Sequence, residues 1–511
     1  LGQSAQETNI FWFQQSSRNF ISDFFDVNNM GAAQDFAVDS PPIGSGRTRF
    51  ALSSYFGRVN YGLMDKYLLT VTGRFDGSSK FGSSNKYAFF PSAALAWRVS
   101  EEPFLKGNRV ISNLKLRTSY GLTGNSETAP YSALPTLRSV TSVFGNQRVV
   151  GVATNRLGND DLKWEKTAQS DIGLEIGLFS NRIAIEADVY YRRTTDMLLS
   201  APLPVTSGYG TITRNVGTME NKGIEFTVTT QNIETPDFSW RTTFNIAMNR
   251  NKVLKLANPA PIFGVGNPNF TNQTGVIMEG QPVGSFWGLN RLGTWGTDEA
   301  AEAAKFGSNT YRGTGKPLLP GDVKYQDVDG NYAINDNDRM IIGNGNPKSY
   351  GSFINNIQYK AFDLVLDLQY SYGNDVLNMT MHSGEDRTGL ANSYASVLNA
   401  WTPEKQGGEI AAVRDSKAGY VSNVDTHWIE DGSFLRGRNL VIGYTLPSDV
   451  VERIHLSRAR VYVSTQNFFL ATKFSGNDPE VSTYTNPFAQ GQTFFDYPKP
   501  TTYMFGISVG L

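Results

Sequence analysis

Apolar and polar residues alternate with a period of two along many short stretches of this chain. In residues 183–191, isoleucine, alanine, valine and tyrosine fall on one side, while Glu186 and Asp188 fall on the other. The same alternation recurs in residues 224–230 and 242–248. Strict period-two alternation predicts β-strands with one apolar and one polar face.

Strands of this kind are expected along the whole chain, with short turns alternating with long polar connections. Antiparallel strands of about ten residues joined in this way predict an all-β fold, a transmembrane antiparallel β-barrel. About fourteen strands are expected: residues 5–15, 49–61, 67–75, 87–98, 114–122, a strand ending before Phe179, then 183–191, 224–230, 242–248, 349–359, 362–371, 435–444, 458–470 and 501–511.

The long connections are expected to be loops at the extracellular end of such a barrel. They comprise residues 123–162, the Gly-, Thr- and Asn-rich stretch between 191 and 224, residues 251–347 with a short helix at 298–306, and residues 374–433 with a helix at 393–401.

The composition supports a membrane-facing surface. Charged residues make up 18 % of the chain, below the roughly 25 % of soluble proteins, while aromatic residues reach 12 %. A large soluble all-β protein is the alternative interpretation. No run of about 18 apolar residues is present, so no transmembrane helix is expected. The net charge of -1 provides no basic field for nucleic acid.

The polar faces of the predicted strands carry the candidate substrate path. A carboxylate facing lipid is costly, so acidic and amide side chains in mid-strand are expected to face the lumen. The predicted lumen residues are Glu186, Asp188, Glu225, Asn245 and Asp367.

Residues 327–338 resemble a Ca²⁺-binding loop in spacing. Oxygen-bearing side chains stand at positions 1, 3, 5, 9 and 12, as in the EF-hand loop, although Tyr332 replaces the glycine at position 6. We expect a structural Ca²⁺ site that stiffens a long loop; the alternative is a turn with solvated Asp and Asn side chains. The predicted ligands are Asp327, Asp329, Asn331 and Asp338.

Other candidate chemistry is weaker. The chain has no cysteine, which excludes disulfides, thiolate metal sites and a cysteine nucleophile. His382, His427 and His455 are widely separated and near no Gly-x-Ser-x-Gly segment, so no enzyme is expected. Six aromatic residues of the predicted loops would stack on sugars or, as the more expected alternative, pack within the loops: Tyr209, Phe286, Trp287, Trp295, Tyr394 and Trp401.

Several segments together resemble the SusC/RagA family of TonB-dependent outer-membrane transporters of Bacteroidota. The resemblance extends from about residue 48 to the end of the chain. The segments that carry it are Asp76–Gly82, Phe89–Ser92, Ala96–Arg98, Ser100–Glu102, Leu114–Asn125, Leu162–Lys166, Asn215–Glu225, Pro320–Asp327, Gly443–Pro447, Gln466–Asn467 and Asp478–Glu480. Arg74, Asp76 and Lys80, at the first of them, are expected to hold a turn rather than to touch substrate.

The resemblance implies an outer-membrane importer of oligosaccharides or peptides. Such proteins have a 22-stranded barrel embedded in membrane lipid and lipopolysaccharide, a SusD-like surface lipoprotein as a lid, and energy supplied by the TonB complex. The family's plug domain, its TonB-contacting segment and the first part of its barrel are not visible here. Residues 1–511 would thus be the C-terminal portion of the barrel, with the extracellular insertion 251–347 inside it. A passive porin and a surface glycan-binding β-protein remain as alternatives.

Overall fold

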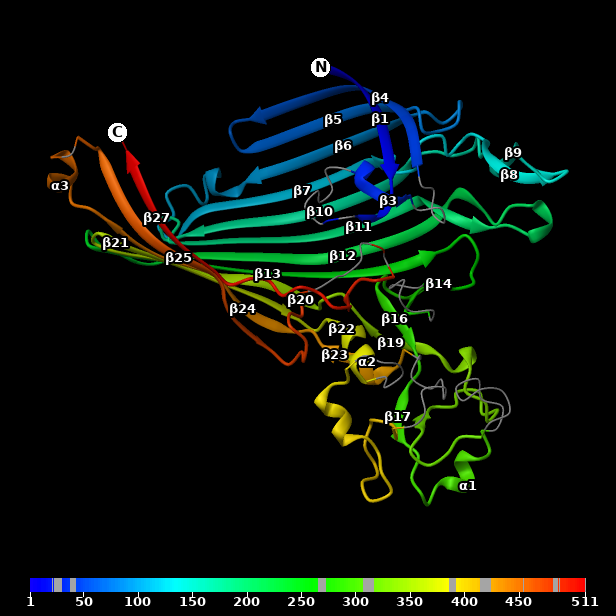
Figure 1. Cartoon of the computed structure of the whole chain (residues 1–511). Helices are drawn as coiled ribbons and strands as arrows, with labels where there is room; N and C mark the ends of the chain where they lie inside the picture. Colours follow the sequence, from blue (N-terminus) through cyan, green and yellow to red (C-terminus); the bar gives the residue numbers. More distant parts are fainter. Residues whose placement is uncertain are drawn as a thin grey trace.

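A computed structural model describes the chain except for residues 21, 23–29, 37–42, 265–272, 307–316, 386–391, 414–423, 454, 481–485, 487 and 511. Its main feature is one antiparallel, strongly curved sheet of fourteen strands (Figure 1). In spatial order the strands are β1 (Gly2–Gln15), β4 (Ile43–Leu63), β5 (Tyr67–Ser78), β6 (Tyr87–Arg98), β7 (Ile111–Asn125), β10 (Glu165–Leu178), β11 (Ile183–Pro202), β12 (Thr211–Glu234), β13 (Phe238–Lys255), β20 (Ser349–Tyr359), β21 (Phe362–Tyr372), β24 (Phe434–Thr445), β25 (Arg458–Thr472) and β27 (Thr502–Gly510).

The sheet follows chain order, and β1 and β27 form its two edges. Among the described residues the two edges do not pair, so the barrel is not closed. The predicted barrel fold and its fourteen strands are confirmed. Several strands are longer than expected: β11 and β12 leave only residues 203–210 between them, so most of the predicted Gly- and Thr-rich loop is strand.

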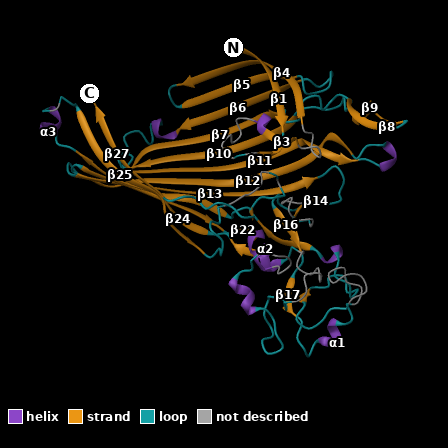
Figure 2. Cartoon of the chain, viewed as in Figure 1, coloured by secondary structure: helices purple, strands orange, loops and turns teal. Residues whose placement is uncertain are grey.

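Smaller elements lie in the connections, mainly at the long-loop end (Figure 2). The additional strands are β2 (Ser17–Phe20), β3 (Ala33–Phe36), β8 (Thr136–Phe144), β9 (Gln147–Arg156), β14 (Ile262–Gly264), β15 (Gly275–Ile277), β16 (Ser285–Gly288), β17 (Arg291–Thr294), β18 (Val323–Tyr325), β19 (Met340–Asn344), β22 (Asp375–Asn378), β23 (Ile429–Asp431) and β26 (Gln492–Thr493). The helices are α1 (Ala300–Ala303), α2 (Met379–Glu385) and α3 (Ser448–Glu452), with short 3₁₀ turns η2 (Met30–Ala32), η3 (Val99–Glu101), η4 (Val205–Ser207), η5 (Asp336–Asp338), η6 (Ala395–Asn399) and η8 (Thr426–Trp428).

The predicted helices are shorter than expected. The Ala-rich stretch 298–306 contains only the four-residue helix α1, and the expected helix at 393–401 is the 3₁₀ turn η6. Helix α2 was not predicted, and neither was the β8–β9 hairpin, which occupies the connection expected to be a polar loop. Within the described part of the chain, no helix is long and apolar enough to cross a membrane.

The register of the sheet gives it one polar and one apolar face. Asp188 lies opposite Gly173 on β10 and Glu225 on β12, while Val189 lies opposite Ile172 and Ile224. Cross-strand partners share a face, so each strand adds its polar residues to the same side. Many side chains of the apolar face are exposed, among them Val59, Val71, Leu95, Ile172, Val189, Ile224, Ile442, Phe505 and Ile507.

Two long connections, 256–348 and 373–433, pack together beyond one end of the sheet; we call this unit the loop body (Figure 1). Two clusters of buried side chains hold it together. The first contains Leu289, Trp295, Ala303, Phe306, Leu318, Val323, Tyr325, Ile334 and Ala411. The second contains Phe286, Leu377, Met379, Val424 and Trp428. Since both clusters take side chains from both connections, the loop body folds as one unit.

Candidate functional site

All five predicted lumen residues lie on the polar face of the sheet. The register places Asp188 opposite Glu225, and Asn245 opposite Thr227 and Ser352. Following the register from β20 to β21 puts Asp367 on the same side. The structure therefore brings the five residues to one surface; their role in a substrate path stays a prediction.

A charged network that the sequence did not reveal surrounds Asp188 on this face. Arg117 Nη2 of β7 lies 3.1 Å from both carboxylate oxygens of Asp188. Arg117 Nε lies 2.8 Å from Glu175 Oε1 of β10, and Lys115 Nζ lies 3.2 Å from the same oxygen. Two cations thus balance two carboxylates across three strands.

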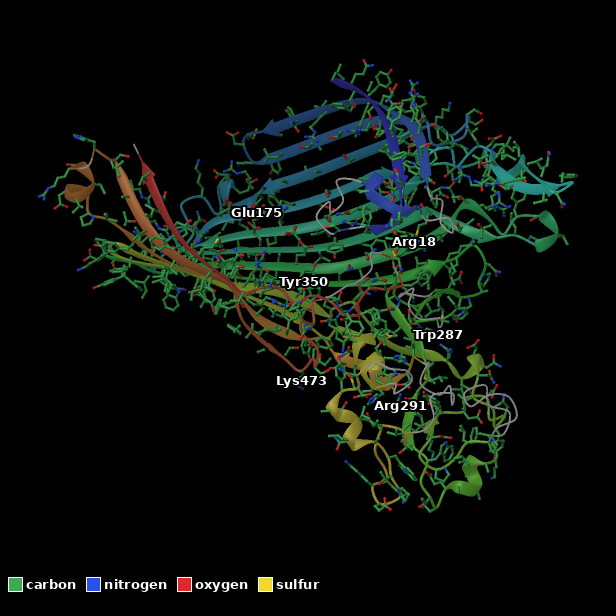
Figure 3. All side chains as sticks on the ribbon, viewed as in Figure 1. Arg18, Glu175, Trp287, Arg291, Tyr350 and Lys473 are labelled. Atoms are coloured by element: carbon green, nitrogen blue, oxygen red, sulfur yellow. The ribbon has the colours of Figure 1, made fainter. Side chains whose placement is uncertain are left out.

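Three other described carboxylates of the polar face lack a close ion pair, whereas Asp363 pairs with Arg460. Among the described residues, Glu186 and Glu225 take part in no ion pair, and one carboxylate oxygen of Asp367 is buried without a hydrogen-bond partner. Arg438 is a charged neighbour of Asp367, so Glu186 and Glu225 are the two predicted lumen carboxylates for which the described residues provide no ion pair. In Figure 3, Glu175 and Tyr350 mark the sheet, while Trp287 and Arg291 lie in the loop body.

The first signature segment contributes to the polar face and to a core beside it. Arg74 donates two hydrogen bonds to Asp76, at 3.0 and 2.9 Å, and both residues line a hollow in the sheet. Lys80 is buried, with its ammonium 4.5 Å from the centre of the Phe50 ring. Lys80 thus joins neighbouring strands and loops, as expected of a residue that holds a turn.

Three signature segments converge on this core, which we call the signature core. It contains Phe81, Phe90, Ala133, Leu162 and Trp164. The Trp164 ring centre lies 5.3 Å from that of Phe81 and 5.5 Å from that of Phe90, and its indole N–H donates to the carbonyl of Lys86 at 2.9 Å. These signature segments therefore hold the connection after β5 against the connection before β10.

A buried ion pair joins the two long connections of the loop body. Arg291 Nε and Nη2 donate to Asp425 Oδ2, and the Tyr325 hydroxyl donates to the same oxygen at 2.8 Å. The side chains of Arg291 and Asp425 are 6 % and 0 % exposed. Burial, followed by the nearby Asp425 carboxylate, raises the pKa of Tyr325 well above its usual value. The hydroxyl therefore stays a donor throughout the physiological pH range.

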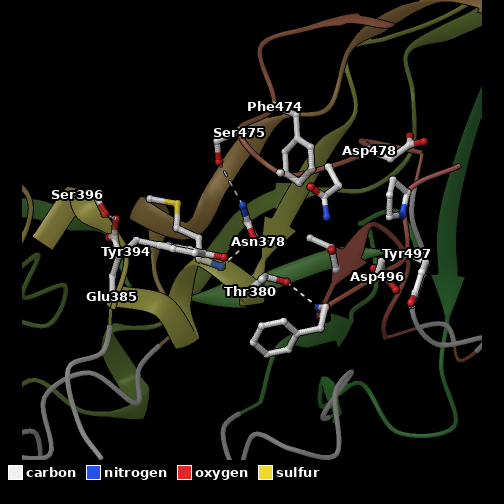
Figure 4. A pocket seen from close by; sticks show the side chains of 16 residues that line it. Asn378, Thr380, Glu385, Tyr394, Ser396, Phe474, Ser475, Asp478, Asp496 and Tyr497 are labelled. Carbon is white, nitrogen blue, oxygen red and sulfur yellow. Dashed lines mark hydrogen bonds between the residues drawn. The ribbon is translucent and has the colours of Figure 1, made fainter. Parts of the chain in front are cut away.

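Most of the loop aromatics predicted as possible sugar platforms are packing residues. Phe286, Trp295 and Trp401 are buried, in accord with the packing alternative. Trp287 packs against Phe263, with ring centres 5.1 Å apart. Tyr394 differs, because it is 46 % exposed and lines a cavity (Figure 4). Tyr209 is half-buried, and its role stays a prediction.

The predicted Ca²⁺ loop brings its carboxylates together. One oxygen from each of Asp327, Asp329 and Asp338 lies within 4.8 Å of the others. Tyr332 has φ +57° and donates its N–H to Asp327 Oδ2 at 2.9 Å. The tight turn expected from glycine is thus made with a tyrosine, in a conformation that is uncommon for bulky residues. Asn331 instead hydrogen-bonds Asp329 and accepts from the Ala333 N–H.

Comparison with known proteins identifies the family. A family model described as TonB dependent receptor-like, beta-barrel matches residues 1–372. TonB-dependent receptor P3 of Formosa agariphila is 39 % identical over 90 % of this chain and 45 % of its own length. TonB-dependent receptor SusC of Bacteroides thetaiotaomicron is 30 % identical over 90 % of this chain and 44 % of its own length. The chain belongs to the SusC/RagA family of Bacteroidota.

Solved structures agree with this assignment. The RagAB peptide transporter superposes with a TM-score of 0.78 at 26 % identity, covering 99 % of this chain and 52 % of that chain. The chain thus spans about half the length of the relatives that it matches. As a TonB-dependent receptor barrel of this family, it is an outer-membrane protein, and its apolar sheet face is the lipid-facing surface.

Proposed function

We propose that the chain forms channel wall and extracellular loops of an active importer of oligosaccharides or peptides. The importer would be energised through TonB and capped by a SusD-like surface lipoprotein. The observation that carries the proposal is the one-sided chemistry of the fourteen-stranded sheet. Its polar face holds Asp188, Glu225 and the Arg117 network, while its opposite face is apolar. The likeness to the RagAB peptide transporter supports the same activity.

Uptake in cells tests this proposal. A strain lacking the full-length gene would be complemented and given fluorescent oligosaccharides or peptides, with and without a protonophore. We expect complementation to restore uptake and the protonophore to abolish it. Uptake that persists without the proton gradient would indicate a passive porin. Surface binding without uptake would indicate a glycan-binding protein.

We further propose the β8–β9 hairpin as a seat for the lid lipoprotein. Leu137, Val143, Val150 and Val152 share one face of this two-stranded ribbon and are 68–71 % exposed. An isolated hairpin is marginally stable in water, so a covering partner would stabilise it. Residues 128–159 contain three arginines and no Asp or Glu. The partner surface would therefore have an apolar centre and an acidic rim.

Polar substitution of this face is expected to release the lid. With Leu137, Val143, Val150 and Val152 all replaced by serine, lid affinity should fall about 100-fold or more, because each buried aliphatic side chain contributes about 1.5–3 kcal/mol. Co-purification of the lipoprotein from mild detergent extracts measures this loss. The control, Ser142→Ala with Gln147→Ala on the opposite face, should retain the lid. Undiminished co-purification of the serine variant would refute the proposed seat.

We also propose that Asp327, Asp329 and Asp338, with Asn331 nearby, hold a structural Ca²⁺ ion. Asp338 is fully buried, and its two oxygens accept the N–H groups of Val328 and Asn335. Each carboxylate oxygen has a second lone pair for a ligand, so these bonds leave room for coordination. A hard cation with oxygen ligands fits this donor set.

Calcium removal is expected to lower the thermal stability of the loop body. A ligand that binds only the folded state at 100 times its Kd stabilises by about 2.7 kcal/mol. Limited proteolysis across a temperature series, with Ca²⁺ or with a chelator, measures this shift. Asp338→Asn should abolish the shift, and Asp336→Asn, whose side chain is 86 % exposed, should preserve it. Identical curves with and without Ca²⁺ in the unsubstituted protein would exclude the site.

A further inference from the structure

Exposed cations gather on the apolar, lipid-facing side of the sheet, at its long-loop end. Lys222 of β12 lies directly opposite Arg250 of β13. One row nearer the loops, Arg193 of β11 and Lys252 of β13 lie on either side of Glu220 of β12. The three strands run side by side in the middle of the sheet (Figure 1). We call the four exposed cations the outer basic patch: Arg193, Lys222, Arg250 and Lys252.

A row of exposed apolar side chains borders the outer basic patch on the same face. Side chains two residues apart on a strand share a face, so Lys222 adjoins Ile224. The row crosses four strands, is 41–66 % exposed and consists of Ile172, Val189, Ile224 and Met248. Arg193 is ten residues from the start of β11 at its short-turn end, and a transmembrane strand has about 9–11 residues. The outer basic patch therefore lies at the outer boundary of the lipid-facing band.

The outer basic patch has an excess of positive charge. Among the described residues, none of its four cations takes part in an ion pair. Glu220 is the one carboxylate that the register of the described strands places between them, and it accepts a hydrogen bond from the Tyr191 hydroxyl at 3.1 Å. Arg250 Nη1 donates to the carbonyl of Lys348 at 2.8 Å, which holds the guanidinium at the end of its strand. Like charges directly opposite each other destabilise a strand pair, so Lys222 and Arg250 favour an anion between them.

We propose that the outer basic patch binds the phosphate-bearing headgroup of a lipid in the outer leaflet. A phosphate between Lys222 and Arg250 would relieve their repulsion, because arginine binds phosphate through paired hydrogen bonds and lysine attracts it as a point charge. The acyl chains of the same lipid would lie on the apolar row. Tyr191, opposite Lys222 and 41 % exposed, has an amphipathic ring suited to the boundary between headgroup and acyl chains. This site lies on the outside of the barrel and does not depend on the proposed importer function.

Other occupants match only one half of this surface. A free phosphate ion would meet the cations but would leave the adjoining apolar row uncovered. A lipid with a neutral headgroup would cover the apolar row but would leave four cations beside a low-dielectric layer without a counter-charge, which is costly. A lipid with a phosphate headgroup satisfies the cations and the apolar row together.

Native mass spectrometry of the full-length protein in a neutral detergent tests the inference. The probes are a diglucosamine lipid with one phosphate, the same lipid without its phosphate, and inorganic phosphate as a competitor. We expect the phosphorylated lipid to bind more tightly than the dephosphorylated one, and an excess of inorganic phosphate not to displace it. Lys222→Gln combined with Arg250→Gln should weaken this binding about 30-fold, since each cation near an anionic headgroup contributes about 1 kcal/mol.

Two further variants separate the site from general charge effects. Arg192→Gln combined with Arg241→Gln removes two cations from the opposite, polar face of β11 and β13 and should leave lipid binding unchanged. Glu220→Gln keeps an acceptor for the Tyr191 hydroxyl but removes the negative charge, so it should strengthen binding of the phosphorylated lipid about fivefold. Heat-dependent mobility on gels shows that each variant is folded.

Three results would overturn the proposal. Equal affinity for the phosphorylated and dephosphorylated lipids would show that the cations hold no headgroup. An equal loss of binding in the polar-face control would show that net charge, rather than the outer basic patch, attracts the lipid. Displacement of the phosphorylated lipid by inorganic phosphate would show a site for soluble anions instead of a lipid site.

Discussion

Replacement of Asp425 by alanine is expected to destabilise the loop body by about 3–5 kcal/mol, the cost of removing one partner of a buried ion pair. Asp425 accepts hydrogen bonds from Arg291, from the Tyr325 hydroxyl and from the His427 N–H. Alanine would leave a buried guanidinium and a buried phenol without their shared acceptor. Proteolysis of the loops at a temperature series measures the effect, while the sheet should remain folded.

An exposed ion pair in the same unit is the matched control for Asp425. Lys305 and Glu302 are 53 % and 48 % exposed, and exposed pairs contribute at most about 1 kcal/mol. Glu302→Ala should therefore have little effect on loop proteolysis. Equal proteolysis of the Asp425 and Glu302 variants would show that the buried pair does not hold the loop body together.

Replacement of Trp164 by alanine is expected to cost about 3–5 kcal/mol, the usual range for a buried tryptophan. Trp164 is 5 % exposed and packs between Phe81 and Phe90. Its loss would separate the connection before β10 from the connection after β5. The urea midpoint of unfolding and the heat-dependent mobility of the barrel on gels measure this change.

A conservative variant separates packing from hydrogen bonding at Trp164. Trp164→Phe keeps an aromatic ring in the signature core but removes the hydrogen bond to the Lys86 carbonyl. We expect it to cost less than the alanine variant, because an orphaned carbonyl costs about 1–3 kcal/mol. An equal decrease in the free energy of unfolding in both variants would contradict the packing argument. An unchanged urea midpoint in Trp164→Ala would contradict a structural role for this residue.

The strands could be predicted from the sequence because alternation is a local signal. Residues 183–191 and 362–371 show it over most of their length, and both lie in strands of the sheet. Strand ends could not be predicted in the same way. Residues 192–202 do not alternate and residues 211–223 are rich in Thr, Gly and Asn. Both are nevertheless strand, because β11 and β12 pair with each other far beyond the alternating segment.

The polar face of the sheet could be predicted from the sequence, but the ion pairs between its side chains could not. Alternation places Asp188 on the polar side, whereas its contact with Arg117 depends on the register of three strands. The cavity lined by Tyr394 and Tyr497 could not be predicted for a similar reason, since these two residues are more than a hundred residues apart in the sequence. Whether a loop aromatic residue packs or is free to bind a ligand depends on the solvent exposure of its side chain. That exposure is set by the tertiary fold and cannot be predicted from a single position in the sequence.

Single-cysteine labelling tests most directly whether the polar face of the sheet lines a water-filled path. Residues 1–511 contain no cysteine, so in a full-length protein whose remaining cysteines are replaced by serine, Glu225→Cys and Ile224→Cys place single thiols on opposite faces of β12. In outer-membrane vesicles, we expect the cysteine at position 225 to react with a charged, water-soluble thiol reagent and the cysteine at 224 to react only with a lipid-soluble one. The reverse pattern, or equal labelling of both positions by the charged reagent, would contradict the account.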